Sequence, residues 1–228
     1  MFDRFKHRSY DLERLDTGDY TAAEYARWHR EMWFIHRFFG EMRALKNSLF
    51  KTIEASGKSL VSILDVGAGA GELLSELRKW TADRDAFLVG AEINAAAAAE
   101  IRDANIDAVR CDALRLPFAD ESFDYVFCSL FLHHLGDESA VELLREMGRV
   151  AANGIFVIDL NRNATAYYFY KFFVGLFLQR FTRDDGALSI LRSFTSEEMA
   201  ALAENAGLYD IRVERSTANR LILSGRCR

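Results

Sequence analysis

Residues 64–71 read Leu-Asp-Val-Gly-Ala-Gly-Ala-Gly (LDVGAGAG), and this stretch decides the fold. It ends the apolar run 59–66 and leads into GELLSELRKW at 71–80, so its glycines lie where a buried strand turns into a helix. Glycines at such a turn let the backbone approach a ligand with no Cβ in the way. The stretch therefore predicts a cofactor loop at the carboxyl end of a strand.

On both sides of this loop, short apolar runs alternate with helix-length stretches. Short continuous apolar runs are typical of buried parallel strands, and the stretches between them are amphipathic or rich in alanine. Such alternation predicts an α/β fold with a doubly wound, mostly parallel sheet and right-handed crossovers. The expected strands are 59–66, 86–92, 107–111, 123–129 and 154–160, and the expected helices are 71–80, 94–105 and 138–153.

The C-terminal part predicts a different kind of pairing. Residues 210–216 and 220–226 read as two strands separated by only three residues, so we expect a hairpin that gives the sheet an antiparallel edge. Before it, Thr195 and Glu198 have the spacing of a capping box, and Gly207 follows the last apolar turn of the helix that they begin.

Composition excludes several classes of protein. The 228 residues are 50% hydrophobic and 28% charged, which excludes a disordered or fibrous chain. The 29 Lys and Arg against 34 Asp and Glu give a net charge of −5, which argues against a nucleic-acid partner. Cys111, Cys128 and Cys227 form no pair at metal-ligand spacing, so we expect no disulfide and no metal.

The N-terminal sequence and one apolar run predict where in the cell the protein is located. The start MFDRFKHRSYDLERL is charged throughout and lacks the apolar core of a secretory signal, so we expect a cytoplasmic protein. The aromatic run 166–178 is too short to span a bilayer, and Lys171 and Gly175 interrupt it. We therefore expect no transmembrane segment.

Acidic residues narrow the choice of ligand. A dinucleotide fingerprint needs a third glycine at position 72, where this chain has Glu72, and a carboxylate there also disfavours a phosphate at the helix N-terminus. Glu92 ends the next strand, where it can accept hydrogen bonds from two ribose hydroxyls. Asp112 follows the third strand, where it can accept one from an exocyclic amine such as that of adenine. A nucleoside without phosphate is the ligand that these features favour.

With these motifs the chain resembles the class I S-adenosylmethionine-dependent methyltransferases, in the small-molecule branch typified by quinone-precursor methyltransferases. The resemblance covers about residues 59–160 and includes LDVGAGAG, AEIN, CDALRLPF and SFDYVFCSLFLHHL in order. It implies a Rossmann-like methyltransferase fold with S-adenosylmethionine as cofactor. Together with the helical pattern of the first 58 residues, these features lead us to expect an N-terminal helical cap (1–58) and a methyltransferase domain (59–228) with an inserted lid around 164–194.

The resemblance also implies roles for individual residues. The loop is expected to hold the methionine part of the cofactor, Glu92 the ribose, Ile93 one face of the adenine, and Asp112 with Ala113 the adenine edge. Ser129 and Phe131 are expected near the sulfonium. The loop residues concerned are Asp65, Gly67, Ala68, Gly69 and Gly71. One departure from the family is AANG before the fifth strand, where a Pro-Gly-Gly turn is usual, and we expect Asn153 and Gly154 to form a substitute turn.

Three residues are candidates for catalysis. A phenol or alcohol loses a proton as it is methylated, and histidine is the side chain best matched to accept it at neutral pH. His133 and His134 follow the fourth strand, where the family places the reacting methyl, and Asp159 ends the fifth. We expect one of the two histidines to face the pocket and to pair with Asp159, although packing of a histidine and a structural role for Asp159 remain the alternatives.

Two aromatic segments point to the acceptor. Residues 28–39 and 167–177 flank the sheet region and are dense in Trp, Tyr and Phe. As a lid they favour a flat, hydrophobic acceptor and exclude water. The alternatives are ordinary core packing, and a surface for peripheral membrane contact or for a homodimer rather than a monomer.

The function predicted is transfer of a methyl group from S-adenosylmethionine to a small aromatic or hydrophobic acceptor, with O-methylation favoured and C-methylation the alternative. S-adenosylhomocysteine is the expected product. Two other functions remain open from the sequence: another nucleoside-dependent transfer, and binding of the cofactor by a non-catalytic partner protein.

Overall fold

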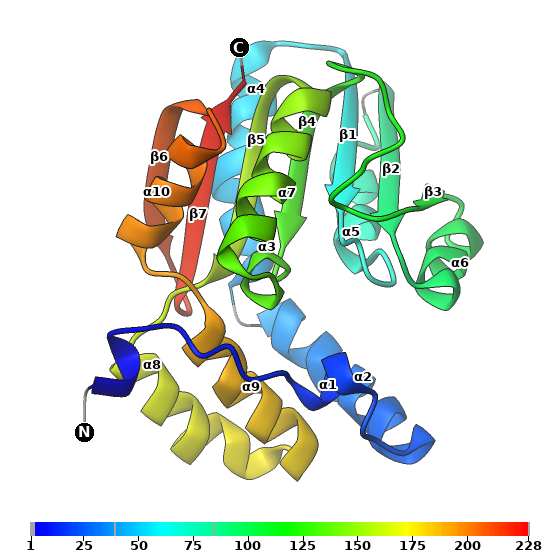
Figure 1. Ribbon diagram of the computed structural model, residues 1–228. Coiled ribbons are helices and arrows are strands. Elements are labelled where there is room, and N and C mark those ends of the chain that lie inside the picture. The colour runs from blue at the N-terminus through cyan, green and yellow to red at the C-terminus, as the bar shows by residue number, and fades with distance from the viewer. Residues whose placement is uncertain (1–2, 39, 84, 228) are drawn as a thin grey trace.

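The sheet confirms the predicted topology (Figure 1). A computed structural model describes residues 3–38, 40–83 and 85–227, and in these residues seven strands form one sheet in the order β3-β2-β1-β4-β5-β7-β6. The first five pair in parallel, whereas β7 runs antiparallel to both of its neighbours. The strands are β1 (Leu60–Val66), β2 (Asp85–Glu92), β3 (Asp107–Arg110), β4 (Phe123–Ser129), β5 (Ala151–Leu160), β6 (Tyr209–Ser216) and β7 (Arg220–Arg226).

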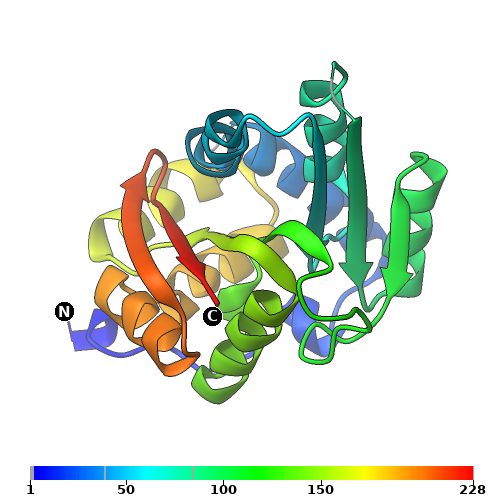
Figure 2. The same cartoon turned by 90° about the horizontal axis from the view of Figure 1, so that it is seen from above.

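Both faces of the sheet are covered, which is why its central strands read as continuous apolar runs. Along β1, Leu64 and Val66 belong to the core on one face, and Val61 and Ile63 belong to the core on the other. Figure 2 shows helices on the two sides of the sheet. The first face packs against α7 (Asp137–Val150) and α10 (Ser196–Asn205), and the second against α4 (Lys51–Ser56), α5 (Glu72–Trp80) and α6 (Ala95–Asp103).

The N-terminal helices fall into two groups. Helix α3 (Glu41–Leu45), the π-helical turn η2 (Lys46–Phe50) and α4 contribute buried side chains to the second face of the sheet. By contrast, α1 and α2 lie beyond the carboxyl ends of the parallel strands, beside α8 and α9 (Figure 1). The elements at this end of the sheet are η1 (Asp3–Phe5), α1 (Arg14–Thr17) and α2 (Ala22–Phe38) from the N-terminal part. From later in the chain they are α8 (Ala164–Phe169), the turns η4 (Tyr170–Val174) and η5 (Gly175–Phe177), and α9 (Arg180–Arg192).

Two predictions of local structure are confirmed at the C-terminal end. Thr195 accepts a hydrogen bond from the backbone of Glu198, and the Glu198 side chain accepts one in return, so the capping box begins α10 as expected. The turn between β6 and β7 places Ala218 and Asn219 at φ of 53° and 62°, the left-handed conformation that tight hairpins require.

The turn predicted at Asn153 and Gly154 is wrong. Helix α7 ends at Val150 and β5 begins at Ala151, so both residues lie inside the strand. Gly154 pairs with Tyr125 of β4, and a Cβ on it would lie 3.2 Å from the carbonyl oxygen of Gly225 on β7. The glycine therefore serves the close approach of a neighbouring strand rather than a turn.

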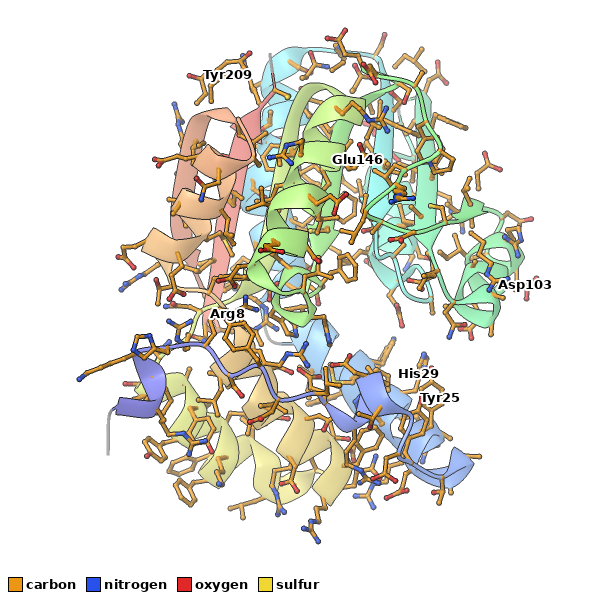
Figure 3. All side chains as sticks on the ribbon, viewed as in Figure 1. Arg8, Tyr25, His29, Asp103, Glu146 and Tyr209 are labelled. Carbon is orange, nitrogen blue, oxygen red and sulfur yellow. The ribbon has the colours of Figure 1, made fainter. Side chains whose placement is uncertain are left out.

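The N-terminal segment is tied to the rest of the molecule by Arg8, which Figure 3 labels where this segment passes beneath α7. Its Nη1 atom donates to Asp137 at 2.5 Å and its Nη2 atom to the carbonyl oxygen of Leu135 at 2.9 Å. Its guanidinium also lies over the ring of Phe194, 3.6 Å from the centroid. These contacts hold residues 9–17 against the carboxyl end of the sheet.

The aromatic run has both buried and exposed members. Tyr167 is buried, whereas Phe172, Phe173 and Phe177 are 56%, 63% and 85% exposed. In the part of the chain that the structure describes, no helix combines the length and apolar character needed to cross a membrane.

Candidate active site

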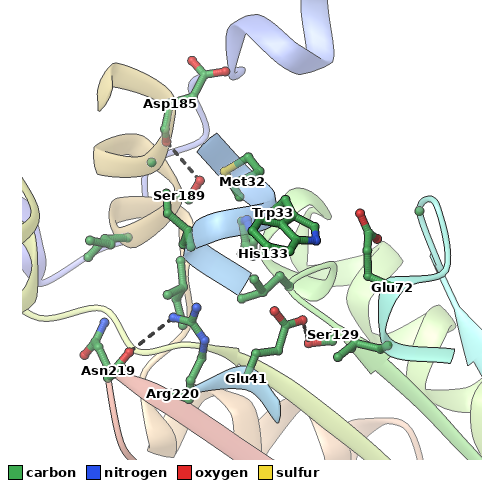
Figure 4. A pocket seen from close by; sticks show the side chains of 18 of the residues that line it. Met32, Trp33, Glu41, Glu72, Ser129, His133, Asp185, Ser189, Asn219 and Arg220 are labelled. Atoms are coloured by element: carbon green, nitrogen blue, oxygen red, sulfur yellow. Dashed lines mark hydrogen bonds between the residues drawn. The ribbon is translucent and has the colours of Figure 1, made fainter. Parts of the chain in front are cut away.

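A cavity of about 1200 Å³ lies at the carboxyl ends of β1, β4 and β5, beneath α2, α8 and α9 (Figure 4). Pockets for a single small ligand are usually roughly 300–1,000 Å³, so this one has room for a cofactor and a second molecule. Its walls bring together seven of the residues predicted to form the site: Asp65, Gly67, Ala68, Gly69, Ser129, His133 and His134.

The glycine loop forms one wall. Gly67 and Gly69 have φ of 71° and 54°, the left-handed conformation that favours glycine. A Cβ on Gly67 would lie 2.8 Å from the ring of Phe131, so Phe131 packs directly on the loop. A Cβ on Gly69 would meet nothing within 4 Å, which leaves its backbone open to a ligand.

Glu92 reaches this loop from the end of β2. Its Oε2 atom accepts a hydrogen bond from the backbone of Gly69 at 3.0 Å, and Oε1 accepts one from Asn94 at 2.8 Å. The residues predicted to surround the adenine lie at the neighbouring strand ends and do not line the large cavity. Ile93 is 63% exposed, and the Asp112 carboxylate, followed by Ala113, accepts from the backbone of Leu114 at 2.9 Å.

The wall beside the loop is strongly acidic. Burial, together with the negative charges of Glu41, Glu92 and Glu72, raises the pKa of Asp65 well above its ordinary value. Carboxylates gathered in this way gain from a positively charged ligand that replaces the lost water. The site is therefore suited to a cation.

His133 and Asp159 form a buried pair on the opposite wall. Nδ1 of His133 lies 2.7 Å from Oδ1 of Asp159, and the His133 backbone donates to Oδ2 at 3.0 Å. Burial disfavours the Asp159 carboxylate, but the adjacent His133 and the hydrogen bonds from His133 and Leu160 outweigh burial and lower its pKa. The pair therefore fixes the orientation of the imidazole, and Nε2 is the ring nitrogen that does not contact Asp159.

The sequence analysis missed Glu13, which completes this wall. Its Oε1 atom lies 3.9 Å from Nε2 of His133 and accepts a hydrogen bond from Ser189 at 2.8 Å. Burial raises the pKa of Glu13 to about 7. The Asp185 carboxylate accepts from the backbones of Arg14 and Leu15 and so holds the segment in place. No feature of the charged N-terminal sequence distinguishes Glu13 from its neighbours.

His134 also faces the cavity, but with a different partner. Its Nδ1 atom lies 3.1 Å from Oδ1 of Asp16. One ligand-type atom from each of Glu13, His133 and His134 lies within 4.8 Å of the other two. Two imidazoles and a carboxylate can hold a divalent metal, and the same set can also move protons.

Two further residues that the sequence analysis missed line the cavity near Ser129. The Ser129 hydroxyl donates to Oε1 of Glu41 at 2.5 Å. Arg220, the first residue of β7, lies in the same wall and is only 4% exposed. Its position as a lone cation before an apolar strand is the only signal in the sequence, and it is a weak one.

Comparison with known proteins shows which family the chain resembles in sequence. Residues 63–154 match a family model described as a methyltransferase domain. The chain is 33% identical over 165 residues to a demethylmenaquinone methyltransferase of Roseiflexus sp., covering 65% of this chain and 68% of the relative. It is 36% identical over 100 residues to the ubiquinone/menaquinone biosynthesis C-methyltransferase UbiE of Xanthomonas campestris, which is 40% of this chain and 38% of that relative.

Solved structures agree in fold. The plantazolicin methyltransferase BpumL, in complex with a monoazolic desmethylPZN analog and SAH, superposes with a TM-score of 0.71 at 15% identity over 91% of each chain. A Thermotoga maritima protein described as a SAM-dependent methyltransferase, possible histamine N-methyltransferase, gives 0.62 at 19% identity over 90% of this chain and 96% of its own. Glu13, Glu41 and Arg220 all lie outside the residues that match the family model.

Proposed function

We propose that this chain, which belongs to the small-molecule branch of the class I S-adenosylmethionine-dependent methyltransferases, methylates a hydroxyl group on an aromatic or otherwise hydrophobic acceptor. The observation that carries this proposal is the buried His133–Asp159 pair in the wall of the large cavity, with a separation of 2.7 Å. Such a pair is suited to accept a proton from a hydroxyl, and that step is useful only for an acceptor that has one.

The residues around the glycine loop fit S-adenosylmethionine. The open space at Gly69 admits the cofactor backbone, and the acidic wall at Asp65 and Glu92 suits a ligand with positive charges. Bound there, the cofactor supplies an electrophilic methyl group on a positively charged sulfur. Asp65, Glu92 and the glycine loop are the residues that we propose hold it.

In the proposed mechanism His133 is the general base. Its Nε2 atom accepts the proton that the acceptor hydroxyl loses as the oxygen takes the methyl group. Asp159 holds the opposite nitrogen and stabilises the imidazolium that forms. Glu13, 3.9 Å from Nε2, is close enough to hydrogen-bond the same acceptor hydroxyl and so to orient it.

The lining of the cavity supports a hydrophobic acceptor. Trp28 and Trp33 enter from α2, and Phe169 and Tyr170 enter from the aromatic run. Flat apolar walls of this kind bury an aromatic ring and exclude water from the reacting atoms.

C-methylation is a second candidate, favoured by the names of the relatives. Two of them are described as a demethylmenaquinone methyltransferase and a C-methyltransferase of quinone biosynthesis. A deprotonated phenol carries negative charge on the ring carbons beside the oxygen as well as on the oxygen. The same base therefore serves either outcome.

The product decides between them. The protein would be incubated with S-adenosylmethionine labelled with ¹³C in the methyl group and with a naphthohydroquinone or an alkylphenol, and the product examined by NMR. A methoxy carbon supports O-methylation, and a ring methyl carbon supports C-methylation.

The base is tested separately with His133→Ala and with His134→Ala, the histidine that contacts Asp16 rather than Asp159. Loss of turnover in the first variant with unchanged binding of S-adenosylhomocysteine is expected. Full turnover in His133→Ala would overturn the assignment of the base. Metal addition and chelation in the same assay test whether Glu13, His133 and His134 act through a bound ion.

A further inference from the structure

The imidazoles of His133 and His134 are each held by a carboxylate. Nδ1 of His133 lies 2.7 Å from Oδ1 of Asp159, and Nδ1 of His134 lies 3.1 Å from Oδ1 of Asp16. A carboxylate accepts the proton of Nδ1, so Nε2 is in each ring the nitrogen that carries the lone pair. A single pair of this kind suits a general base. Two adjacent pairs are typical of a metal site, where such carboxylates orient the histidine ligands and raise their basicity.

Glu13 supplies a third acceptor atom beside these rings. Its Oε1 atom lies 3.9 Å from Nε2 of His133, too far for a hydrogen bond, and one ligand-type atom from each of Glu13, His133 and His134 lies within 4.8 Å of the other two. Ser189 donates to Oε1 at 2.8 Å and holds the carboxylate in place. Two ligands of a tetrahedral zinc ion lie about 3.4 Å apart, so side-chain movements of about 1 Å bring the three atoms to that spacing.

The charges around these three side chains favour a divalent cation. Glu13, Asp16 and Asp159 place three carboxylates beside the two imidazoles. The guanidinium of Arg192, whose Nη1 atom lies 2.5 Å from Oδ2 of Asp16, offsets one of the three charges. Glu13 and His133 are only 4% and 3% exposed, so water contributes little to their stabilisation. An ion with two positive charges matches what remains.

We propose that Glu13, His133 and His134 bind a divalent transition-metal ion through one carboxylate oxygen and Nε2 of each imidazole. Two nitrogen ligands and one oxygen suit Zn²⁺ better than Mg²⁺ or Ca²⁺, which prefer oxygen. All three residues line the large cavity, so a fourth position is open to water or a ligand, as in zinc sites with three protein ligands. The absence of a metal was expected from the spacing of the cysteines, and this set contains no cysteine.

Occupancy of the site would affect the proposed function, on which this one consequence rests. The lone pair on Nε2 of His133 can bind an ion or accept a proton, but not both at once. A bound ion is therefore expected to inhibit methylation of any hydroxyl for which His133 is the base. Binding of the ion itself needs neither cofactor nor acceptor, so it can be measured whether or not the proposed function holds.

Binding is measured on the full chain, prepared without a histidine tag and freed of metal with a chelator. Calorimetric titration with ZnCl₂ gives the stoichiometry and the affinity, and the visible absorption spectrum of added Co²⁺ reports the number of ligands. The variants are Glu13→Gln and His134→Ala, which each remove one ligand, and Asp16→Asn, which removes the carboxylate behind His134. His7→Ala and Glu204→Gln change an exposed histidine and an exposed glutamate outside the cavity and are the matched controls.

The native chain is expected to bind one Zn²⁺. Glu13→Gln and His134→Ala should each weaken binding by at least about 100-fold, and Asp16→Asn by about 10–100-fold, whereas the two controls should leave it unchanged. No binding by the native chain, or equal binding by the native chain and both ligand variants, would overturn the proposal. If Glu13→Gln fails to fold, His134→Ala decides, because that side chain is 23% exposed and its loss is better tolerated.

The effect on turnover separates this proposal from the proposed function. Zn²⁺ should abolish methylation by the native chain as it fills the site, and a chelator should restore it. Zn²⁺ that binds with the expected dependence on Glu13 and His134 but leaves turnover unchanged would overturn the role of His133 as the base and would support the metal site.

Discussion

The two halves of the cavity are built in different ways. The cofactor half comes from neighbouring strand ends, with the loop after β1 and Glu92 at the end of β2, and the backbone amide of Gly69 donates the hydrogen bond that joins them. The acceptor half brings together side chains from remote parts of the chain: Glu13, His133, Asp159 and Ser189. A loop whose backbone conformation requires glycine leaves a motif in the sequence. Side chains that meet only in the folded protein leave none.

The largest effect is expected from Asp159→Asn, which tests the acceptor half. The amide keeps the size of the side chain but cannot stabilise an imidazolium at Nδ1 of His133. We expect kcat to fall by about 10²–10⁴-fold, while the affinity for S-adenosylhomocysteine is retained. Steady-state kinetics and calorimetric titration measure the two quantities.

Asp124→Asn is the control for that variant. Asp124 lies on β4 and accepts hydrogen bonds from Ser62 and Asn153, away from the cavity. Its loss should lower stability without a comparable fall in kcat. If Asp159→Asn weakened cofactor binding as much as it slowed turnover, the two halves of the cavity would not be separable.

The next largest effect concerns Glu13 and pH. Its pKa is raised to about 7 in the folded protein from an ordinary 4.5, so folding favours the neutral form. The stability that this residue contributes is full below pH about 4.5 and is lost as pH rises through about 7. Glu13→Gln keeps a neutral group at every pH. The free energy of unfolding of the variant, relative to that of the native protein, should therefore rise by on the order of 2–3 kcal/mol between pH 5 and 8.

Chemical denaturation at several pH values measures this difference. Glu204→Gln, on the exposed face of α10, is the control and should show little dependence on pH. A difference between Glu13→Gln and the native protein that stays constant from pH 5 to 8 would contradict the burial of an ionisable group at this position.

The same contrast explains how much of the molecule the sequence could predict. The parallel strands follow from short apolar runs, the hairpin follows from two strands separated by only three residues, and the capping box follows from Thr195 and Glu198. Asn153 and Gly154 misled the prediction because the same dipeptide suits a turn and the close approach of a strand. The difference depends on Gly225 of β7, which lies 71 positions further along the chain and which no local pattern reports.

Within the site, His133, His134 and Asp159 could be predicted because they lie at the ends of β4 and β5, at the same edge of the sheet. Glu13, Glu41 and Arg220 were not, because their positions depend on how the N-terminal helices and the hairpin pack against that edge. The burial of Glu13 arises from Ser189 and its neighbours on α9, and an isolated stretch of charged sequence contains no trace of that contact.

A smaller effect is expected from Gly67→Ala in the cofactor half. Alanine at φ of 71° costs roughly 1–2 kcal/mol, and its Cβ would lie 2.8 Å from the Phe131 ring. Gly69→Ala has the same kind of conformational cost but open space around the Cβ. Gly67→Ala should therefore lose more stability, and Gly69→Ala should lose affinity for S-adenosylhomocysteine beyond its loss of stability. Equal losses of stability would show that the contact with Phe131 contributes nothing.

The smallest effect is expected from Phe177→Ser, in the aromatic run. The side chain is 85% exposed, so little apolar area is lost, and the free energy of unfolding should change by no more than about 0.5 kcal/mol. The measurement is made at two protein concentrations, because the exposed group of Phe172, Phe173, Leu176 and Phe177 is also suited to self-association. A loss of stability that grows with protein concentration would mean that the exposed face of the aromatic run is an interface between copies of the chain. A small change at both concentrations would mean that only its inner face, at Phe169 and Tyr170, bears on the acceptor half.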